Sequence, residues 1–163
     1  MNRTQRAILS SGLLALLLMV VVVVESALAA VVLGTDGNDI LGGTQQRDTM
    51  RGYGGDDVLA GYRARDHIYG GLGRDRLVGW GGSDFIYGDG GNDSLFGGFG
   101  DDRLYGGAGR DEVNAGPGAD VIRVYGDGAI DAVRCGPGAD VVYHDADDIV
   151  ANDCETSIVA VHA

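Results

Sequence analysis

The chain has 163 residues, of which 30 are glycine, and its 24 acidic residues outnumber its 12 basic residues, giving a formal net charge of −12 at pH 7. None of the basic residues is a lysine. Because phosphate binding requires clustered lysine and arginine side chains, this composition argues against a nucleic acid partner.

Residues 1–29 are organised like a secretory signal peptide. Arg3 and Arg6 give a positive start, residues 8–24 are mostly apolar, and Ala27-Leu28-Ala29 fits a small-x-small cleavage site. The apolar stretch is long for a signal peptide, so an uncleaved membrane anchor remains an alternative. We expect cleavage, and therefore a secreted, extracellular chain with no membrane contact.

A repeat of nine residues begins at Gly34. Its first four copies are GTDGNDILG, GTQQRDTMR, GYGGDDVLA and GYRARDHIY, and each has aspartate at its sixth position. The fourth position is glycine in most copies but changes to Gln46 and Ala64 in two of these. We expect left-handed backbone at this position, which costs a residue other than glycine roughly 1–2 kcal/mol.

Residues 70–113 contain the strongest copies, which follow the pattern G-G-x-G-x-D-x-U-x, where U is a large aliphatic residue. Side chains alternate along a strand, so x-U-x predicts a three-residue strand whose U side chain points inward. Stacked strands then form one internal column: Leu77, Ile86, Leu95, Leu104 and Val113. Later copies contain Pro117-Gly118 and Pro137-Gly138, and Pro-Gly is typical of a type II turn, so we expect a similar turn in every copy.

Aspartate recurs at the sixth position without a break in ten copies. If two copies make one coil, aspartates 18 residues apart stack at the strand spacing of roughly 4.8 Å and repel each other. Several Ca²⁺ ions would remove this repulsion, because calcium accepts both carboxylate and backbone carbonyl oxygens. We predict full occupancy along one edge and weak or absent binding beside Gln46 and Ala64 on the other. The predicted ligands are Asp39, Asp57, Asp75, Asp93 and Asp111 on the first edge, and Asp84, Asp102 and Asp120 on the second.

The repeat decays towards the C-terminus. After Arg123 the frame slips by two residues and resumes as GDGAIDAVR and CGPGADVVY. Cys135 and Cys154 are 19 residues apart, close to one coil, so stacking could bring them together. In an exported chain we expect a disulfide that ties down a C-terminal cap of residues 144–163, with two free thiols as the alternative.

The recurring motif resembles the calcium-binding nonapeptide repeat of RTX proteins, also called the hemolysin-type repeat. This resemblance implies an all-β fold, a right-handed parallel β-roll over residues 30–143 with two repeats per coil and Ca²⁺ between successive loops. A thin, glycine-rich solenoid of like charges should need its metal to fold. In RTX proteins such repeats often follow a catalytic domain, but here they fill nearly all of the chain after residue 29.

Three functions compete for this chain. The favoured one is a non-catalytic, calcium-binding structural or adhesion module that contacts a cell-envelope polymer or protein. Tyr69, Tyr87 and Tyr105 lie 18 residues apart and form either a structural stack or a surface that binds carbohydrate or the envelope. A hydrolase is disfavoured because the three histidines are isolated and neither His-Glu-x-x-His nor Gly-x-Ser-x-Gly occurs.

Overall fold

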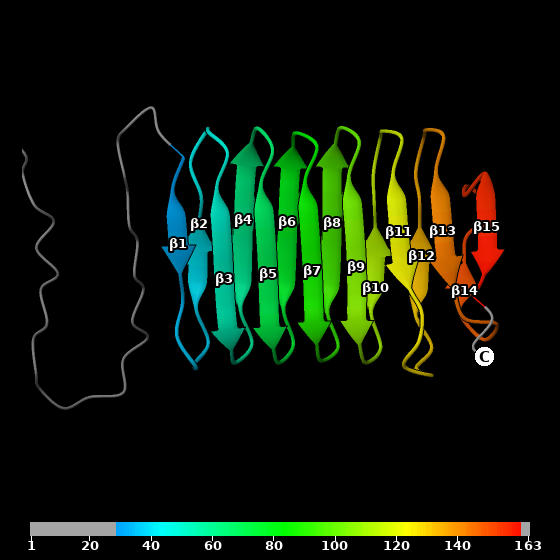
Figure 1. Ribbon diagram of the computed structural model, residues 1–163, viewed down its shortest axis with the longest axis horizontal. Helices are drawn as coiled ribbons and strands as arrows, with labels where there is room; N and C mark the ends of the chain where they lie inside the picture. Colours follow the sequence, from blue (N-terminus) through cyan, green and yellow to red (C-terminus); the bar gives the residue numbers. More distant parts are fainter. Residues whose placement is uncertain (1–28, 161–163) are drawn as a thin grey trace, which may run out of the picture.

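The computed structural model describes residues 29–160, and these form a solenoid of two facing parallel sheets (Figure 1). One sheet contains eight strands: β1 (Val31–Leu33), β3 (Thr49–Gly54), β5 (His67–Leu72), β7 (Phe85–Gly90), β9 (Arg103–Ala108), β11 (Val121–Val124), β13 (Val141–His144) and β15 (Thr156–Val159). The other contains seven: β2 (Ile40–Gly42), β4 (Val58–Arg63), β6 (Arg76–Gly81), β8 (Ser94–Phe99), β10 (Glu112–Asn114), β12 (Ala132–Arg134) and β14 (Ile149–Val150).

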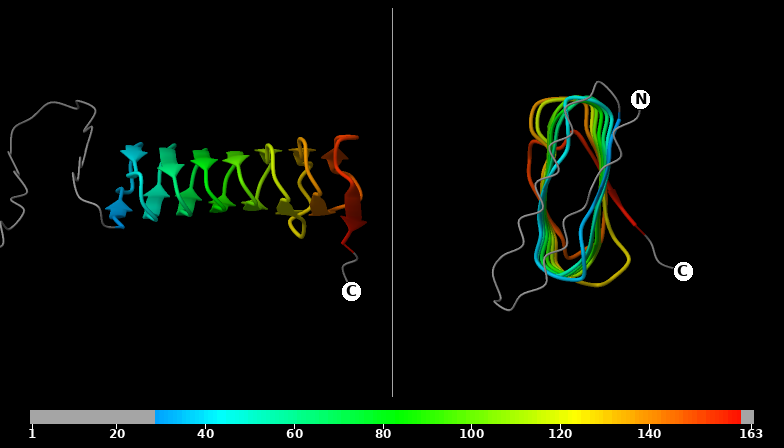
Figure 2. Two further views of the ribbon diagram at one scale, coloured as in Figure 1. Left: turned by 90° about the horizontal axis from the view of Figure 1, so that it is seen from above. Right: turned by 90° about the vertical axis from the view of Figure 1, so that its left-hand side faces the viewer.

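Successive strands alternate between the two sheets, so two repeats make one coil. Within a sheet, Ile68 pairs with Ile86, which pairs with Leu104, and each step is one coil. Seen along the long axis, the coils superpose as a flattened ring (Figure 2). The predicted all-β parallel roll with two nonapeptides per coil is therefore confirmed for the described residues.

The aliphatic U positions form the core between the sheets, as predicted. From Leu59 to Val113 each of them is completely buried. From Ala115 onward, the residue two positions after U is no longer glycine, and its side chain also points inward at Ala115, Val124 and Cys135. The C-terminal coils therefore have two buried columns where the central coils have one.

The strands of the central coils are longer than the sequence predicted. β3 to β9 contain six residues each and continue from x-U-x through the first three positions of the next repeat. Pairing persists because the backbone bends at the second position without leaving the ladder: Tyr53 still pairs with Gly71, and Gly54 with Leu72. The three-residue prediction was wrong because it treated these glycine-rich positions as turn only.

The turn prediction holds for the fourth-position glycines from Gly55 to Gly109 and fails at Gly37 and in the proline copies. Fourth-position glycines such as Gly73 and Gly91 have φ of 126° and 139°. Gly118 and Gly138 avoid the left-handed region because they pair with each other in a parallel bridge, which requires extended backbone. These copies retain positive φ only at the second position, with 101° at Gly116, whereas central copies such as that of Gly71 and Gly73 have it at both positions.

The two substituted turns behave differently from each other. Ala64 has a φ of 71°, as expected for a position that requires left-handed backbone. Gln46 does not, because its copy has threonine at the second position and folds a different turn, in which the Gln46 N–H donates to Thr44 Oγ1. The predicted strain is therefore confirmed at Ala64 and absent at Gln46.

The predicted frame slip and the predicted disulfide are both present in the structure. The N–H of Asp111 bonds to Asp131, 20 residues further on, which confirms the two-residue slip. Cys135 and Cys154 form a disulfide with an S–S distance of 2.02 Å. β14 and β15 continue the two sheets, so residues 149–159 complete the last coil.

Candidate metal centre

Two lines of buried aspartates run along the solenoid, one at each edge. Every member occupies the sixth position of its repeat, immediately before a strand, and its side chain enters the turn rather than solvent. Their exposed fractions do not exceed 6 %. One line precedes the seven-stranded sheet and contains Asp39, Asp57, Asp75, Asp93, Asp111 and Asp131; the other contains Asp48, Asp66, Asp84, Asp102, Asp120 and Asp140.

One carboxylate oxygen of each aspartate links neighbouring coils. The N–H of Asp75 donates to Oδ1 of Asp93 at 2.8 Å, and the N–H of Asp93 donates to Oδ1 of Asp111 at 2.9 Å. The same bond recurs along both lines, including the 20-residue steps from Asp111 to Asp131 and from Asp120 to Asp140. The spacing thus brings the aspartates together as predicted, and half of each carboxylate already has a structural partner.

The second carboxylate oxygen, Oδ2, is buried and has no hydrogen-bond partner in nine of these aspartates. A buried polar atom without a partner is costly, so nine such atoms along the two lines require an explanation. The nine are Asp57, Asp66, Asp75, Asp84, Asp93, Asp102, Asp111, Asp120 and Asp140.

Asp39 and Asp48 differ because threonine occupies the second position of their repeats. The Thr35 N–H and hydroxyl donate to Asp39 Oδ2 at 2.6 and 2.9 Å. The Thr44 N–H and hydroxyl donate to Asp48 Oδ2 in the same way. The Oδ2 atoms of these first two carboxylates are therefore hydrogen-bonded by their own loops.

From Gly52 to Gly106, the first-position glycine makes room for the orphaned oxygen of its repeat. A Cβ added at Gly70 would overlap Asp75 Oδ2 and would lie 2.9 Å from the Gly88 carbonyl oxygen. A Cβ at Gly43 would lie 2.6 Å from Asp48 Oδ2 and 2.9 Å from the Gly61 carbonyl oxygen. Glycine at this position therefore places a carboxylate oxygen and a carbonyl oxygen from the next coil around one small space.

Burial makes these carboxylates hard to ionise without a counter-charge. It raises the pKa of Asp102 to about 8 and the pKa of Asp66, Asp93 and Asp111 to about 7. Repulsion from the aspartate one coil away adds to the effect, and the backbone N–H bonds oppose it. A nearby cation would lower each of these pKa values by favouring the charged form.

The donor set fits a hard cation. Calcium takes six to eight oxygen ligands and accepts backbone carbonyls alongside carboxylates. Nowhere in residues 29–160 do three or more His, Cys, Asp or Glu side chains cluster around a common point. An ion at these edges would therefore be held by orphaned Oδ2 atoms together with backbone carbonyls, rather than by a carboxylate cage.

The structure changes which aspartates are the strongest candidates. The sequence-based set included Asp39, whose second oxygen already has two donors, and omitted Asp66 and Asp140, whose second oxygens have none. The sequence marks all three residues in the same way, because each is the sixth-position aspartate of its repeat. Only the loop geometry separates them, because a threonine at the second position competes with a metal.

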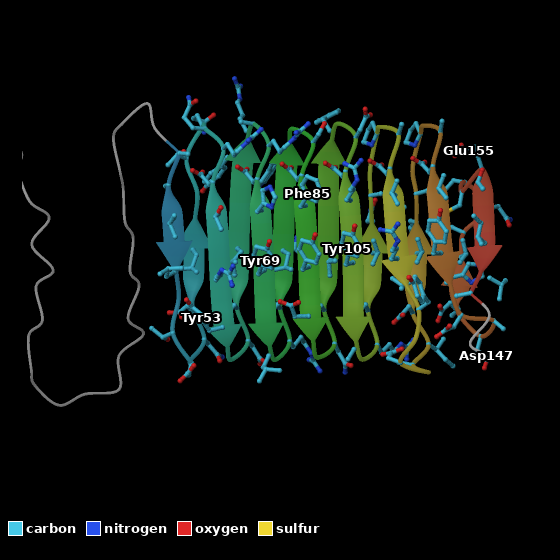
Figure 3. All side chains as sticks on the ribbon, in the orientation of Figure 1. Tyr53, Tyr69, Phe85, Tyr105, Asp147 and Glu155 are labelled. Carbon is cyan, nitrogen blue, oxygen red and sulfur yellow. A yellow bond between two sulfur atoms is a disulfide. The ribbon has the colours of Figure 1, made fainter. Side chains whose placement is uncertain are left out.

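The tyrosine column lies on the outer face of the eight-stranded sheet (Figure 3). Tyr69 and Tyr87 stack with ring centroids 4.9 Å apart, and Tyr87 and Tyr105 with centroids 4.5 Å apart. Arg51 covers the free face of Tyr69, and Arg123 bonds to the Tyr105 hydroxyl at 2.8 Å. The ring faces are thus occupied by each other and by arginine, and the three side chains are half-buried.

Comparison with known families identifies the repeat. The RTX calcium-binding nonapeptide repeat matches four times, over residues 33–66, 52–86, 61–95 and 87–122, which together span more than half of the chain. A search of curated proteins found no match. The matched residues contain both aspartate lines except their last members, Asp131 and Asp140.

Proposed function

The chain belongs to the RTX calcium-binding nonapeptide repeat family, and from this premise we propose that it is a non-catalytic module of the extracellular space whose solenoid folds when it binds calcium. The observation that carries the proposal is the set of nine buried Oδ2 atoms without partners along the two edges. Calcium ions are the ligands that would satisfy them, with carbonyl oxygens of the glycine-rich turns completing the coordination.

The proposed ions lie along both edges of the solenoid. The orphaned oxygens extend from Asp57 to Asp111 on one edge and from Asp66 to Asp120 on the other, and they include Asp140. We propose weaker binding at Asp39 and Asp48, because Thr35 and Thr44 already donate to their carboxylates. This replaces the expectation from sequence that Asp39 is a full site and that the turns of Gln46 and Ala64 are both weak.

Coupling of metal binding to folding follows from charge and burial. Ionised aspartates one coil apart repel each other, and burial removes the water that would screen them. A ligand that binds the folded chain alone stabilises it by mass action. Without calcium, the folded chain still bears the free-energy cost of nine buried carboxylate oxygens without partners, and no bound ion offsets that cost.

Circular dichroism and calorimetry of the chain lacking residues 1–29 test this proposal. We expect a β-rich spectrum in calcium, loss of that spectrum in EDTA, and uptake of several Ca²⁺ ions per chain. Magnesium should substitute poorly, because it demands a tight octahedron and retains its waters. Identical β-rich spectra with and without EDTA would contradict coupled folding, and no calcium uptake would contradict the ligand itself.

The disulfide supports an extracellular location, since disulfides persist in oxidising compartments. The signal peptide expected at residues 1–29 lies almost wholly outside the described residues, which begin at residue 29. The structure has no helix between residues 29 and 160 with the length and apolarity that a membrane crossing requires. We propose cleavage of the signal, secretion, and contact with a cell-envelope polymer or protein.

Two alternatives are less well supported. The ring faces of Tyr69, Tyr87 and Tyr105 stack on each other, which favours a structural role for this column over a carbohydrate surface. A hydrolase would need an activated nucleophile or a general base. His144 bonds instead to Ser157 and to a backbone carbonyl, and His67 stacks on Phe85.

A further inference from the structure

An aromatic groove lies at the edge of the solenoid where β4, β6 and β8 end, the upper edge in Figure 1. It has a volume of about 420 Å³ and is lined by Gln45, Tyr62, Arg63, Trp80, Gly81 and Phe99. Tyr62, Trp80 and Phe99 are 42 %, 58 % and 73 % exposed. This volume falls within the roughly 300–1,000 Å³ of small-ligand sites.

Four successive coils contribute to the groove, with Gln45 on the first and Phe99 on the last. Tyr62 pairs in register with Trp80, and Trp80 pairs with Gly98 on the next strand. In the adjacent row, Arg63 pairs with Gly81, and Gly81 pairs with Phe99. The two glycines have no side chains, so the space beside the Trp80 indole is open. The tyrosine ring lies against Gly42 of the preceding coil, within 3.3 Å of where a Cβ would stand.

Two of these aromatic residues occupy a backbone position that suits glycine. Tyr62 and Trp80 have φ of 80° and 74°, whereas Gly71, Gly98 and Gly107 stand at the same position of other repeats. Left-handed backbone strains any residue with a Cβ. Since both side chains are exposed, little burial offsets that strain. Tyr53 and Asp89 have the same backbone conformation outside the groove, so strain alone does not mark a site. Tyr62 and Trp80 differ because they pair in register and are both exposed, and exposed aromatic residues on adjacent strands indicate a binding role.

The charges around the groove restrict what it binds. Arg63 is exposed, and its side chain makes no ion pair or hydrogen bond within residues 29–160. No carboxylate lines the groove, so the arginine disfavours a cationic ligand. The chain's net charge of −12 disfavours a polyanion. A neutral ligand with apolar faces and hydrogen-bonding groups fits both limits.

We propose that the aromatic groove binds a neutral hexose polysaccharide. The C–H face of a pyranose ring is apolar and stacks on the Trp80 indole and the Tyr62 ring, as other apolar faces pack on aromatic side chains. Arg63 and Gln45 carry N–H donors that reach the sugar hydroxyls at the rim. The tyrosine column on the sheet face takes no part. The site requires folded coils but does not depend on which ion holds them.

The chain carries its own reporter, because Trp80 is its only tryptophan. The experiment titrates the folded chain in millimolar calcium with maltohexaose, cellohexaose and chitohexaose, and follows tryptophan emission. A saturable blue shift with at least one of these oligosaccharides is expected. An acidic galacturonate hexamer and an apolar hexapeptide are titrated in parallel, and neither should bind as well.

Substitution by glycine separates binding from folding. Tyr62→Gly and Trp80→Gly each restore the residue that other repeats carry at this position, so the coils should keep their circular dichroism spectrum. Binding should weaken at least tenfold, by fluorescence for Tyr62→Gly and by calorimetry for Trp80→Gly. Tyr53→Gly is the matched control: Tyr53 has a φ of 81° but lies at the opposite edge (Figure 3).

Three results would overturn the proposal. The first is that no neutral oligosaccharide binds at millimolar concentration to chain shown to be folded. The second is that Tyr53→Gly weakens binding as much as the groove variants do. The third is that the galacturonate hexamer or the apolar peptide binds more tightly than the neutral sugars, which would assign the groove to a different partner.

Discussion

The backbone N–H of Asp57 donates a 2.8 Å hydrogen bond to Oδ1 of Asp75 in the next coil, while Oδ2 of Asp75 is buried without a partner. One carboxylate therefore has two roles. Its first oxygen accepts a hydrogen bond that links neighbouring coils, and its second oxygen is buried where we propose that calcium binds. The same division along both edges explains why a repeat can require aspartate both for its geometry and for its ligand.

The substitution Asp93→Asn should reduce calcium uptake, whereas Asp48→Asn should not. Asp93→Asn retains an oxygen that can accept the Asp75 N–H but replaces the orphaned oxygen with an amide nitrogen, which cannot bind calcium. Asp48 is already held by Thr44, so Asp48→Asn is the matched control. Calorimetric titration counts the ions, and we expect about one ion fewer for Asp93→Asn. Equal losses in the two variants would contradict the distinction between orphaned and satisfied aspartates.

Acid should partly replace calcium. Burial raises the pKa of Asp102 to about 8 and the pKa of Asp93 to about 7, far above roughly 3.9 in an unfolded chain. The metal-free fold therefore binds protons that the unfolded chain does not, so its stability is greatest below about pH 4 and is lost as pH rises through 6 to 8. Circular dichroism in EDTA should show more β-structure at pH 5 than at pH 8. The reverse order would count against the raised pKa values.

Alanine at the first position of a central repeat should be costly. In Gly88→Ala the new Cβ would stand 2.5 Å from Asp93 Oδ2 and would overlap the Gly106 carbonyl oxygen. Overpacking of this kind costs roughly 1–3 kcal/mol, and it also blocks the proposed ligand space. Gly90→Ala meets nothing closer than 3.4 Å and should change the free energy of unfolding little. Urea unfolding in saturating calcium compares the two.

Ala64→Gly should stabilise the chain, and Gln46→Gly should not. Ala64 has a φ of 71°, so glycine relieves roughly 1–2 kcal/mol of strain against an entropy cost of roughly 0.5–1 kcal/mol. Gln46 does not have positive φ, so glycine at this position relieves no strain and adds only the entropy cost. Thermal unfolding in calcium measures the difference. A gain at position 46 as large as that at position 64 would be inconsistent with the threonine turn.

Reducing the disulfide should loosen the C-terminal coils. Cys135 is fully buried, and its bond to Cys154 closes a 19-residue separation, which is worth about 3 kcal/mol in the chain-entropy model. The measurement is the urea midpoint in calcium with and without dithiothreitol. The double variant Cys135→Ser and Cys154→Ser should show no such response to the reductant. An unchanged midpoint in the wild-type chain would show that the last coil is held by packing alone.

Much of the fold can be predicted from the nine-residue period of the sequence. An interval of nine residues with one inward aliphatic residue and one aspartate determines the parallel roll, the core column, the pairing of residues 18 apart and the two edges of carboxylates. The separation of Cys135 and Cys154 likewise predicts their disulfide. These features depend only on which residues stack, and a constant period decides that before any contact is known.

The tertiary structure decided what each stacked residue does. It showed that Thr35 and Thr44 remove two aspartates from the orphaned set, that the strands run on through the glycines, and that the Pro-Gly copies have positive φ two residues before the predicted position. It also brought Tyr62, Trp80 and Phe99 of successive coils into one groove. A period places residues side by side, but the partner of each oxygen and the φ of each bend depend on atoms from several loops at once, which no repeat pattern specifies.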